Sequence, residues 1–577
     1  MDVTPTLNTV PLKPGDFDTL VQALDYAAQG ETGFNFYSRR GEPYSALPYS
    51  QIRTNARKLA RRLLSLNLER GSRVAIVAVT HPDFVRFFFA CQYAGLIPVP
   101  LPAGTHLNGA EAYTKQIRRL IRICGARIAV STADFLPFLK TATEGQGLIM
   151  TAGPEEYDSL RESGGKLHPL EPHELAYLQF TSGSTRFPKG VMITQSAVMD
   201  NLAAITGPGI KVRPGDRAVS WLPFYHDMGL VGLMLASMSC QISVDFFSTI
   251  DFVMRPRLWL KLISENRATI SFGPPFSYEL AAMRLKPGEI GDLDLSNWRI
   301  AGIGAEMIRK DSLDKFANRL EPAGFDPKAF IPCYGMAECS LAVTFASMNN
   351  GVQVDTIDAE HLAETNEVVH VNSNNGNGSR ISTFVRCGAP LPNFEVEIRD
   401  SDGRPVGEGR SGTLFLRGPS IMSGYFGDPE STSEVLDADG WLNTGDMAYW
   451  SGRDIVITGR SKDLIIINGR NIWPQDLEYI AETLEGIRTG DACAFSCHDC
   501  QGHEHAVLMV QSRITDPAEK NRIIEQLKRL VQQELGIECK VEIVPKNTLV
   551  RTTSGKPSRS ATRKVYLNMT TQLQIAA

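Results

Sequence analysis

The stretch QFTSGSTRFPKG, residues 179–190, decides how the fold of the whole chain is interpreted. Its chemistry comes from hydroxyl groups, one glycine and one ammonium group: Thr181, Ser182, Gly183, Ser184, Thr185 and Lys189. Glycine lets the backbone approach an anion closely, and consecutive backbone N–H groups can form an anion-binding nest. The same composition is typical of a plain surface turn. The stretch alone therefore leaves both interpretations open.

A Walker-type phosphate loop is excluded, because it requires a lysine directly after its second glycine and then serine or threonine. In this stretch Lys189 precedes Gly190. The two Gly-Lys pairs at 165–166 and 555–556 are followed by leucine and proline. Other segments must decide whether the stretch holds phosphates.

The composition limits the class of protein. A chain of 577 residues exceeds one hydrophobic core, so at least two domains are expected. Hydrophobic residues make up 43% and the net charge is −5, which indicates a globular protein and no nucleic-acid partner. The N-terminus lacks a secretory pattern, and the apolar segment 229–244 is too short and polar to span a membrane. We expect a cytoplasmic protein with its 10 cysteines reduced.

Apolar strand patterns alternate with helical patterns along the first 300 residues. Strands are predicted at 74–79, 96–100, 128–131, 218–223, 242–247, 269–272 and 299–302, and helices at 83–94 and 110–123. This alternation predicts an α/β fold whose parallel sheets are covered by helices on both faces.

Two changes of composition divide the chain. Residues 347–382 are polar and rich in Asn and Gly, which is typical of a surface insertion or loop. After Arg460 a compact α+β pattern begins, with strands at 464–467, 492–496 and 506–511 and helices at 474–483 and 517–535. We expect a large domain at 1–460, with the insertion inside it, and a small domain at 461–577.

An ordered set of motifs resembles the adenylate-forming superfamily of acyl-CoA synthetases, adenylation domains and luciferases. The motifs are TSGSTRFPKG (181–190), WLPFYHDMGL (221–230), GIGAE (302–306), YGMAE (334–338), TGD (444–446), GRSKDLIIINGRNIWPQDLE (459–478) and TTSGK (552–556). The resemblance covers nearly the whole chain. It implies a large N-terminal domain of parallel-rich sheets with a distorted β-barrel subdomain, and a small mobile C-terminal domain.

The resemblance also implies a role for each matching residue. The loop from Thr181 to Lys189 would hold the β- and γ-phosphates of ATP, and Asp446 the ribose hydroxyls. Residues implied around the adenine and α-phosphate are Gly304, Ala305, Tyr334, Gly335 and Met336. Arg460 would reach the ribose or a phosphate, His226 would lie near the reacting carboxylate, and Glu338 would help to hold Mg²⁺, a cation that prefers oxygen ligands.

Two further assignments concern the small domain. Lys556 would stabilise the charge that develops when a carboxylate attacks the α-phosphate, so that adenylation requires domain closure. Lys462 matches the hinge position. Each residue has an ordinary alternative: Asp446 a turn former, Arg460 a surface ion pair, His226 a core partner of Asp227, and Tyr334 and Met336 core filling.

Three features resemble one branch, the fatty acyl-AMP ligases. The step from Glu338 to Gly388 is 388 − 338 = 50 residues, which is long for the superfamily, Arg186 replaces the usual glycine, and CQYAGLIPVPLP occupies 91–102. These enzymes pass a fatty acyl group to the phosphopantetheine thiol of an acyl carrier protein in polyketide or nonribosomal peptide synthesis. Their insertion is thought to hinder the geometry that uses CoA, although an insertion of this length could also be a neutral surface loop.

Three alternatives remain at this point: a fatty acyl-CoA synthetase, a catalytically silent nucleotide-binding protein, and a luciferase-like enzyme. Arg186 could face the phosphates or the solvent. The cluster CAFSCHDCQGHEH at 493–505 resembles a zinc site. Cys493 and Cys497, however, are predicted on one strand at i and i+4, roughly 13 Å apart, which is too far for one metal ion.

Overall fold

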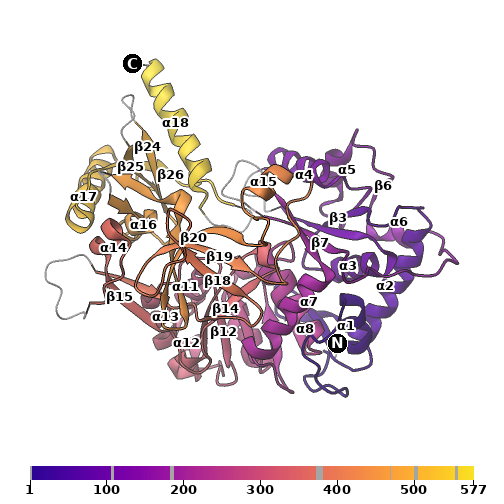
Figure 1. The fold of residues 1–577 in the computed structure, drawn as a ribbon. Helices are drawn as coiled ribbons and strands as arrows, with labels where there is room; N and C mark the ends of the chain where they lie inside the picture. The colour runs from indigo at the N-terminus through magenta and orange to yellow at the C-terminus, as the bar shows by residue number, and fades with distance from the viewer. Residues whose placement is uncertain are drawn as a thin grey trace.

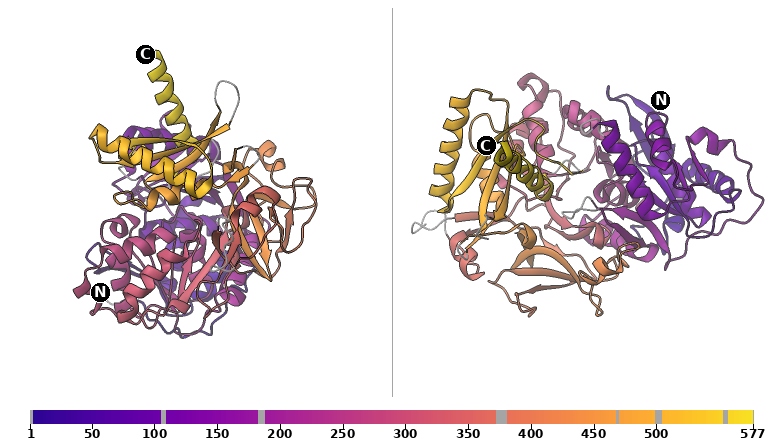
Figure 2. Two further views of the ribbon diagram at one scale, coloured as in Figure 1. Left: turned by 90° about the vertical axis from the view of Figure 1, so that its left-hand side faces the viewer. Right: turned by 90° about the horizontal axis from the view of Figure 1, so that it is seen from above.

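The computed structural model of the protein describes residues 3–104, 109–181, 188–371, 381–467, 470–498, 504–552 and 557–576, with side chains up to residue 570. Figure 1 shows a large body that contains the N-terminus, and a smaller C-terminal unit, coloured orange to yellow, at its upper left. Figure 2 shows the same unit standing on the body in a second direction.

The central sheet of the body has nine strands and a parallel middle. Their order is β17 (Ala389–Pro390), β14 (Ala342–Phe345), β13 (Phe330–Gly335), β12 (Ile300–Ile303), β11 (Ile270–Gly273), β9 (Arg217–Ser220), β10 (Ser243–Phe246), β1 (Gly33–Tyr37) and β2 (Pro43–Pro48). The strands from β13 to β1 run parallel, and antiparallel pairs close both edges. The predicted parallel sheet is confirmed, with strand boundaries within three residues of those expected.

Helices cover this sheet. They are α1 (Leu20–Ala27), α7 (Gln195–Ala204), η3 (Met228–Leu235), α8 (Ala236–Ser239), α9 (Thr249–Met254), α10 (Arg257–Glu265), α11 (Pro275–Arg284) and α13 (Lys310–Leu320). The apolar segment 229–244 folds mainly into η3 and α8 and then enters β10. No helix in the described ranges is long and apolar enough to cross a membrane.

A second, fully parallel sheet lies near the N-terminus, at the right of Figure 1. Its order is β4 (Ile97–Leu101), β3 (Arg73–Val77), β5 (Ile128–Val130) and β6 (Met150–Ala152). The helices of this part are α2 (Tyr49–Leu64), α3 (Pro82–Ala94), α4 (Ala110–Cys124), α5 (Leu136–Thr143) and α6 (Pro154–Asp158). The hairpin of β7 (Leu175–Phe180) and β8 (Gly190–Thr194) follows.

An antiparallel sheet follows the central sheet in sequence. Its strands are β18 (Glu395–Arg399), β19 (Gly412–Arg417), β20 (Leu442–Ser451) and β21 (Asp454–Arg460). A bridge from Arg386 to Val456 links its edge to the hairpin of β15 (Val354–Asp358) and β16 (Ile381–Val385). This is the antiparallel subdomain for which the resemblance implies a distorted β-barrel.

The polar segment at 347–382 is more than a loop, which corrects the expectation from its composition. It contains β15, α14 (Ala359–Thr365) and the start of β16, while residues 372–380 lie outside the described ranges. Asp355 of β15 is buried because Arg386 donates to it at 2.7 Å and the hydroxyl of Tyr449 donates to it at 3.2 Å. A polar strand of this kind is held by partners distant in sequence, and a composition argument does not detect it.

The C-terminal unit has its own buried core. Its elements are β22 (Ile465–Ile467), β23 (Arg470–Ile472), α16 (Pro474–Glu482), β24 (Ala492–His498), β25 (Glu504–Ser512), α17 (Pro517–Leu535), β26 (Cys539–Pro545) and α18 (Arg559–Ala576). Cys493 and Cys497 both lie on β24, as predicted, and are buried.

A buried ion pair joins neighbouring parallel strands of the central sheet. Arg217 on β9 donates to both carboxylate oxygens of Asp245 on β10, at 2.5 and 2.7 Å. The side chains are 3% and 0% exposed, and Asn35 and Asn266 also donate to Asp245, at 2.8 and 2.9 Å. The buried carboxylate is therefore well satisfied, and removing the guanidinium would leave its charge unpaired.

Arg217→Ala should lower the free energy of unfolding by about 3–5 kcal/mol, the usual effect of leaving a buried charge without its partner. Urea unfolding followed by tryptophan fluorescence measures the change. The matched control is Arg161→Ala, which removes an exposed arginine and should change the same quantity by less than about 0.5 kcal/mol. Equal effects of the two substitutions would contradict the assignment.

Candidate active site

Three of the predicted site segments meet at the carboxyl-terminal edge of the central sheet because parallel strands present their carboxyl ends together. The segment containing His226 follows β9, and Gly304 and Ala305 follow β12. Tyr334 and Gly335 end β13, and Met336 and Glu338 come directly after it. Segments separated by more than 100 residues in sequence therefore meet at this edge.

Asp446 links the central sheet to the antiparallel sheet. Its side chain is 7% exposed, and its carboxylate accepts a hydrogen bond from the Tyr334 hydroxyl at 2.6 Å. Asp446 on β20 pairs in register with Arg460 on β21, and Nε of Arg460 donates to the other carboxylate oxygen at 3.0 Å. Asp446 beside it raises the pKa of Arg460, and burial and then Asp446 raise the pKa of Tyr334. Tyr334 therefore stays a hydroxyl donor, and Arg460 stays a cation.

Glu338 and Lys189 meet at Tyr425, a residue that the sequence did not identify. The Tyr425 hydroxyl donates to Glu338 Oε1 at 2.9 Å, and Lys189 Nζ lies 4.6 Å from the centre of the Tyr425 ring. Burial raises the pKa of Glu338, and burial followed by the charge of Glu338 raises the pKa of Tyr425. No local pattern marks Tyr425, since its partners lie 87 and 236 residues away in sequence.

Backbone hydrogen bonds join the two ends of the stretch at 179–190. The backbone N–H of Thr181 donates to the carbonyl of Lys189 at 3.1 Å, and β7 and β8 continue the pairing. Ser182, Gly183, Ser184 and Thr185, together with Arg186, lie outside the described residues. Next to this bond, the ammonium of Lys189 lies over the ring of Tyr425, whose hydroxyl donates to Glu338.

His226 lies in the turn between β9 and the π-helix η3. Its Nδ1 lies 2.6 Å from Asp227 Oδ1, and the two side chains are 24% and 13% exposed. The pair that the ordinary alternative predicted is therefore present, but it lies partly open to solvent at the carboxyl edge of the sheet. The η3 segment is of the rare π type, which often occurs at functional sites.

Close backbone packing explains two glycines of the motifs. A Cβ atom on Gly304 would lie 2.8 Å from Cys333 Sγ, and one on Gly335 would lie 1.9 Å from the Leu341 carbonyl oxygen. Next to Glu338 the backbone is strained: Ser340 adopts φ 65° and ψ −56°, and Leu341 N donates to the Cys339 carbonyl at 2.8 Å. Such outliers cost about 1–3 kcal/mol and cluster at functional sites.

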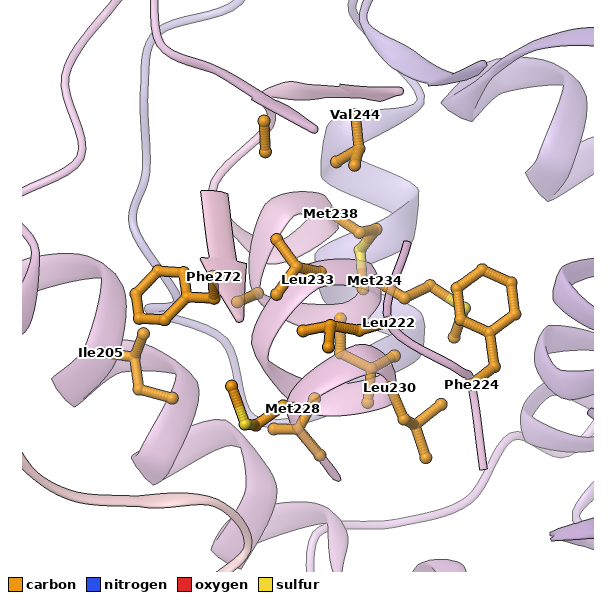
Figure 3. Packing of buried hydrophobic residues seen from close by; sticks show 14 of the residues in the cluster. Ile205, Leu222, Phe224, Met228, Leu230, Leu233, Met234, Met238, Val244 and Phe272 are labelled. Atoms are coloured by element: carbon orange, nitrogen blue, oxygen red, sulfur yellow. The ribbon is translucent and has the colours of Figure 1, made fainter. Parts of the chain in front are cut away.

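The apolar segments near His226 pack tightly, as Figure 3 shows for residues of η3. Met228, Leu230, Leu233 and Met234 lie with Ile205, Leu222, Phe224, Met238, Val244 and Phe272 in one buried cluster. The ring of Phe272 covers Gly302, where an added Cβ atom would lie 1.9 Å from it. These residues form an apolar wall beside the polar edge.

Lys462 lies between two charged anchors. The short turn Ser461–Asp463 joins β21 to β22, and Lys462 is exposed on it. Asp463 accepts from Arg559 at 2.8 Å, and Arg559 also donates to Glu478 at 2.8 Å. Lys556 lies outside the described residues. Among the described residues on either side of it, Arg551 is bridged to Pro557, and Ser558 N donates to the Val550 carbonyl at 2.8 Å.

Known proteins match this arrangement. The model of the AMP-binding enzyme family matches residues 27–426. A Caulobacter vibrioides protein provisionally named an acyl-CoA synthetase is 45% identical, with 98% of each chain covered. JamA of Moorena producens, named a medium-chain-fatty-acid–[acyl-carrier-protein] ligase, is 30% identical, with 96% of each chain covered.

A solved structure agrees with the family match. It comes from a study of fatty acyl-adenylate ligases from E. coli and L. pneumophila, has a TM-score of 0.92 and 44% identity, and the alignment covers 97% of this chain and 100% of that one. The chain is therefore an AMP-binding enzyme, a ligase that belongs with the fatty acyl-AMP ligases.

Proposed function

We propose that the enzyme uses ATP to convert a fatty acid to its acyl-adenylate with release of pyrophosphate. It then transfers the acyl group to the phosphopantetheine thiol of an acyl carrier protein of the polyketide or nonribosomal peptide synthase type. The main structural support is the buried Asp446 held by Tyr334 and Arg460, beside the edge where His226 and Glu338 lie. A carrier protein as the acyl acceptor is supported by two relatives named as acyl-carrier-protein ligases, which are JamA and the TtuA protein of Teredinibacter turnerae.

The polar groups of the edge suit a nucleotide. Asp446 has about four lone-pair positions, so it can accept ribose hydroxyls while it keeps its bonds to Tyr334 and Arg460. Gly304 and Gly335 pack closely against Cys333 and Leu341, and this packing fixes the segments that would lie around the base. The backbone bond between Thr181 and Lys189 joins the two ends of the loop, and the positive charge of the Lys189 ammonium suits the β- and γ-phosphates. Ser182, Gly183, Ser184 and Thr185 complete this proposed clamp.

The chain also fits a divalent cation bound together with the nucleotide. Magnesium sites of this kind use one or two carboxylates and the phosphates of the substrate, and Glu338 offers a carboxylate that accepts from Tyr425, the residue over whose ring Lys189 lies. In the described ranges no cluster of three or more His, Cys, Asp or Glu side chains is placed to hold a metal ion alone. Magnesium bound at Glu338 would neutralise phosphate charge during the reaction.

The proposed reaction has two balanced steps. A carboxylate oxygen of the fatty acid bonds to the α-phosphorus, the bond to the bridging oxygen breaks, and its electron pair leaves with pyrophosphate. The thiol sulfur then bonds to the acyl carbon, AMP leaves with the electrons of the acyl–oxygen bond, and the thiol proton passes to solvent. His226, two residues before η3 begins, would orient the carboxylate in the first step.

The proposed domain division follows the sequence: a large domain at 1–460 and a mobile domain at 461–577. Lys556 would reach the α-phosphate from the small domain when the chain rotates at Lys462. The separate core of the C-terminal unit supports a rigid-body movement.

The segment at 347–382 supports the carrier acceptor over CoA. Its helix α14 lies beneath the C-terminal unit in Figure 1. Arg470 of that unit lies 3.2 Å from Glu360 and 3.9 Å from Glu364 of α14. These contacts would favour one placement of the small domain. A second candidate function, fatty acyl-CoA synthesis, is favoured by the name of the Caulobacter relative.

Lys556→Ala should abolish adenylation and leave ATP binding in place. Its ammonium would act mainly on the transition state, so its loss should raise the barrier by about 3–4 kcal/mol, a roughly 10²- to 10³-fold loss of rate. Fatty-acid-dependent exchange of pyrophosphate into ATP measures the rate, and calorimetry measures ATP affinity.

Lys564→Ala is the matched control, since Lys564 is an exposed lysine on α18 of the same unit. It should leave both quantities unchanged. If ATP affinity disappeared together with turnover in Lys556→Ala, the transition-state role would be wrong. No fatty-acid-dependent exchange in the wild-type protein would exclude the enzyme function as proposed.

The acceptor is tested by product analysis with ATP, Mg²⁺, a fatty acid and equal amounts of CoA and phosphopantetheine-bearing carrier protein. Acyl-carrier product should exceed acyl-CoA by roughly tenfold or more, a difference of about 1.4 kcal/mol in barrier. Arg470→Ala should raise acyl-CoA by about two- to fivefold, because partly exposed ion pairs contribute about 0.2–1 kcal/mol each.

The control for this variant is Arg529→Ala, which removes an exposed arginine of α17 in the same unit. Acyl-CoA in amounts comparable to the acyl-carrier product of the wild-type protein would establish the synthetase alternative. Oxidised products would instead identify a luciferase-like reaction.

A further inference from the structure

Tyr425 lies where the two charged parts of the proposed site meet. Its hydroxyl donates to the Glu338 carboxylate at 2.9 Å. The Lys189 ammonium lies over its ring, with Nζ 4.6 Å from the ring centre. We infer that Tyr425 is a positioning residue that fixes the carboxylate of Glu338 and the ammonium of Lys189 relative to each other. This inference rests on the proposed function.

The backbone around Tyr425 is fixed from several directions. Residues 423–426 lie alongside β8: Ser423 N donates to the Met192 carbonyl at 3.0 Å, Met192 N to the Gly424 carbonyl at 3.0 Å, and Phe426 N to the Gly190 carbonyl at 2.8 Å. The segment thus pairs with β8 through the antiparallel bridge between Tyr425 and Val191, directly after Lys189 and Gly190. The distance between this hairpin and the Tyr425 side chain is set by these bonds.

The same segment is fixed to Glu338. Met422 N donates to the Glu338 carbonyl at 2.8 Å, and Tyr425 N donates to the Thr432 hydroxyl at 2.9 Å. Glu338 is therefore held by this segment through both its backbone and its side chain. A small shift of the segment would move Glu338 and Lys189 together.

The two contacts of Tyr425 have different chemistry and can be separated by substitution. The hydroxyl acts on the carboxylate as a hydrogen bond to a charged acceptor. The ring acts on the ammonium through its π face and needs no hydroxyl. Phenylalanine therefore removes only the first contact, and leucine removes both.

The proposed coupling predicts distinct effects on a divalent cation and on pyrophosphate. Tyr425→Phe should weaken the binding of Mn²⁺ roughly tenfold, because Glu338 loses a hydrogen bond that orients it. Pyrophosphate affinity should be unchanged in Tyr425→Phe and should fall about two- to fivefold in Tyr425→Leu, where the cation–π contact is lost. The KM for the fatty acid should be unchanged in Tyr425→Phe.

Electron paramagnetic resonance of Mn²⁺ with the full-length protein and α,β-methylene-ATP measures the first quantity without turnover, and calorimetry with pyrophosphate measures the second. Tyr449→Phe is the matched control. It also removes a hydroxyl that donates to a carboxylate, here that of Asp355 at a distance of 3.2 Å, and this pair lies outside the proposed site. Melting temperatures of all three variants verify folding.

Equal Mn²⁺ affinity in Tyr425→Phe and the wild-type protein would overturn the inference, as would an equal loss in Tyr449→Phe. An equal loss of pyrophosphate affinity in the Phe and Leu variants would exclude the role of the ring. If wild-type protein binds neither Mn²⁺ with the ATP analogue nor pyrophosphate, the proposed function fails and this inference fails with it. Wild-type binding with unaffected variants rejects only the role of Tyr425.

Discussion

The buried carboxylate of Asp446 is the constraint on which the geometry of the site depends. It lies on the antiparallel sheet, yet its two oxygens are held by Tyr334 from the central sheet and by Arg460 from the neighbouring strand. A carboxylate on a side chain with 7% exposure requires such partners, because leaving a buried charge unpaired costs several kcal/mol. The two sheets are therefore fixed relative to each other at the point where the loops of the parallel strands end.

This constraint explains why the site is built from distant segments. Site residues lie in the segments that follow β9 and β12 and at and after the end of β13. Glu338, for example, depends on Tyr425, which is itself fixed by pairing with β8. The site is thus a product of the sheet topology, and a single motif such as residues 179–190 cannot define it.

The sequence predicted the parallel sheet and α17 well because buried strands and amphipathic helices have local periodicity. Its predictions were weaker where distant partners decide the structure. The strand predicted at 218–223 ends at Ser220, where Trp221 leaves the sheet and stacks on Phe252 at 3.8 Å. The strand β15 was missed because Arg386 and Tyr449, far away in sequence, allow Asp355 to be buried. The π form of η3 was missed for a different reason, since an apolar run gives no signal that separates a π-helix from an α-helix.

The charges around the proposed hinge explain why rotation would be concentrated at one residue. Arg460 is bonded to Asp446 of the large body, and the Ser461 hydroxyl donates to the Gly445 carbonyl at 3.1 Å. On the other side Asp463 is bonded to Arg559, which Glu478 holds within the C-terminal unit. Only Lys462 stands between these two anchored groups. A rotation of the small domain that preserves both sets of bonds would be concentrated in this short turn, which supports the hinge proposed at Lys462.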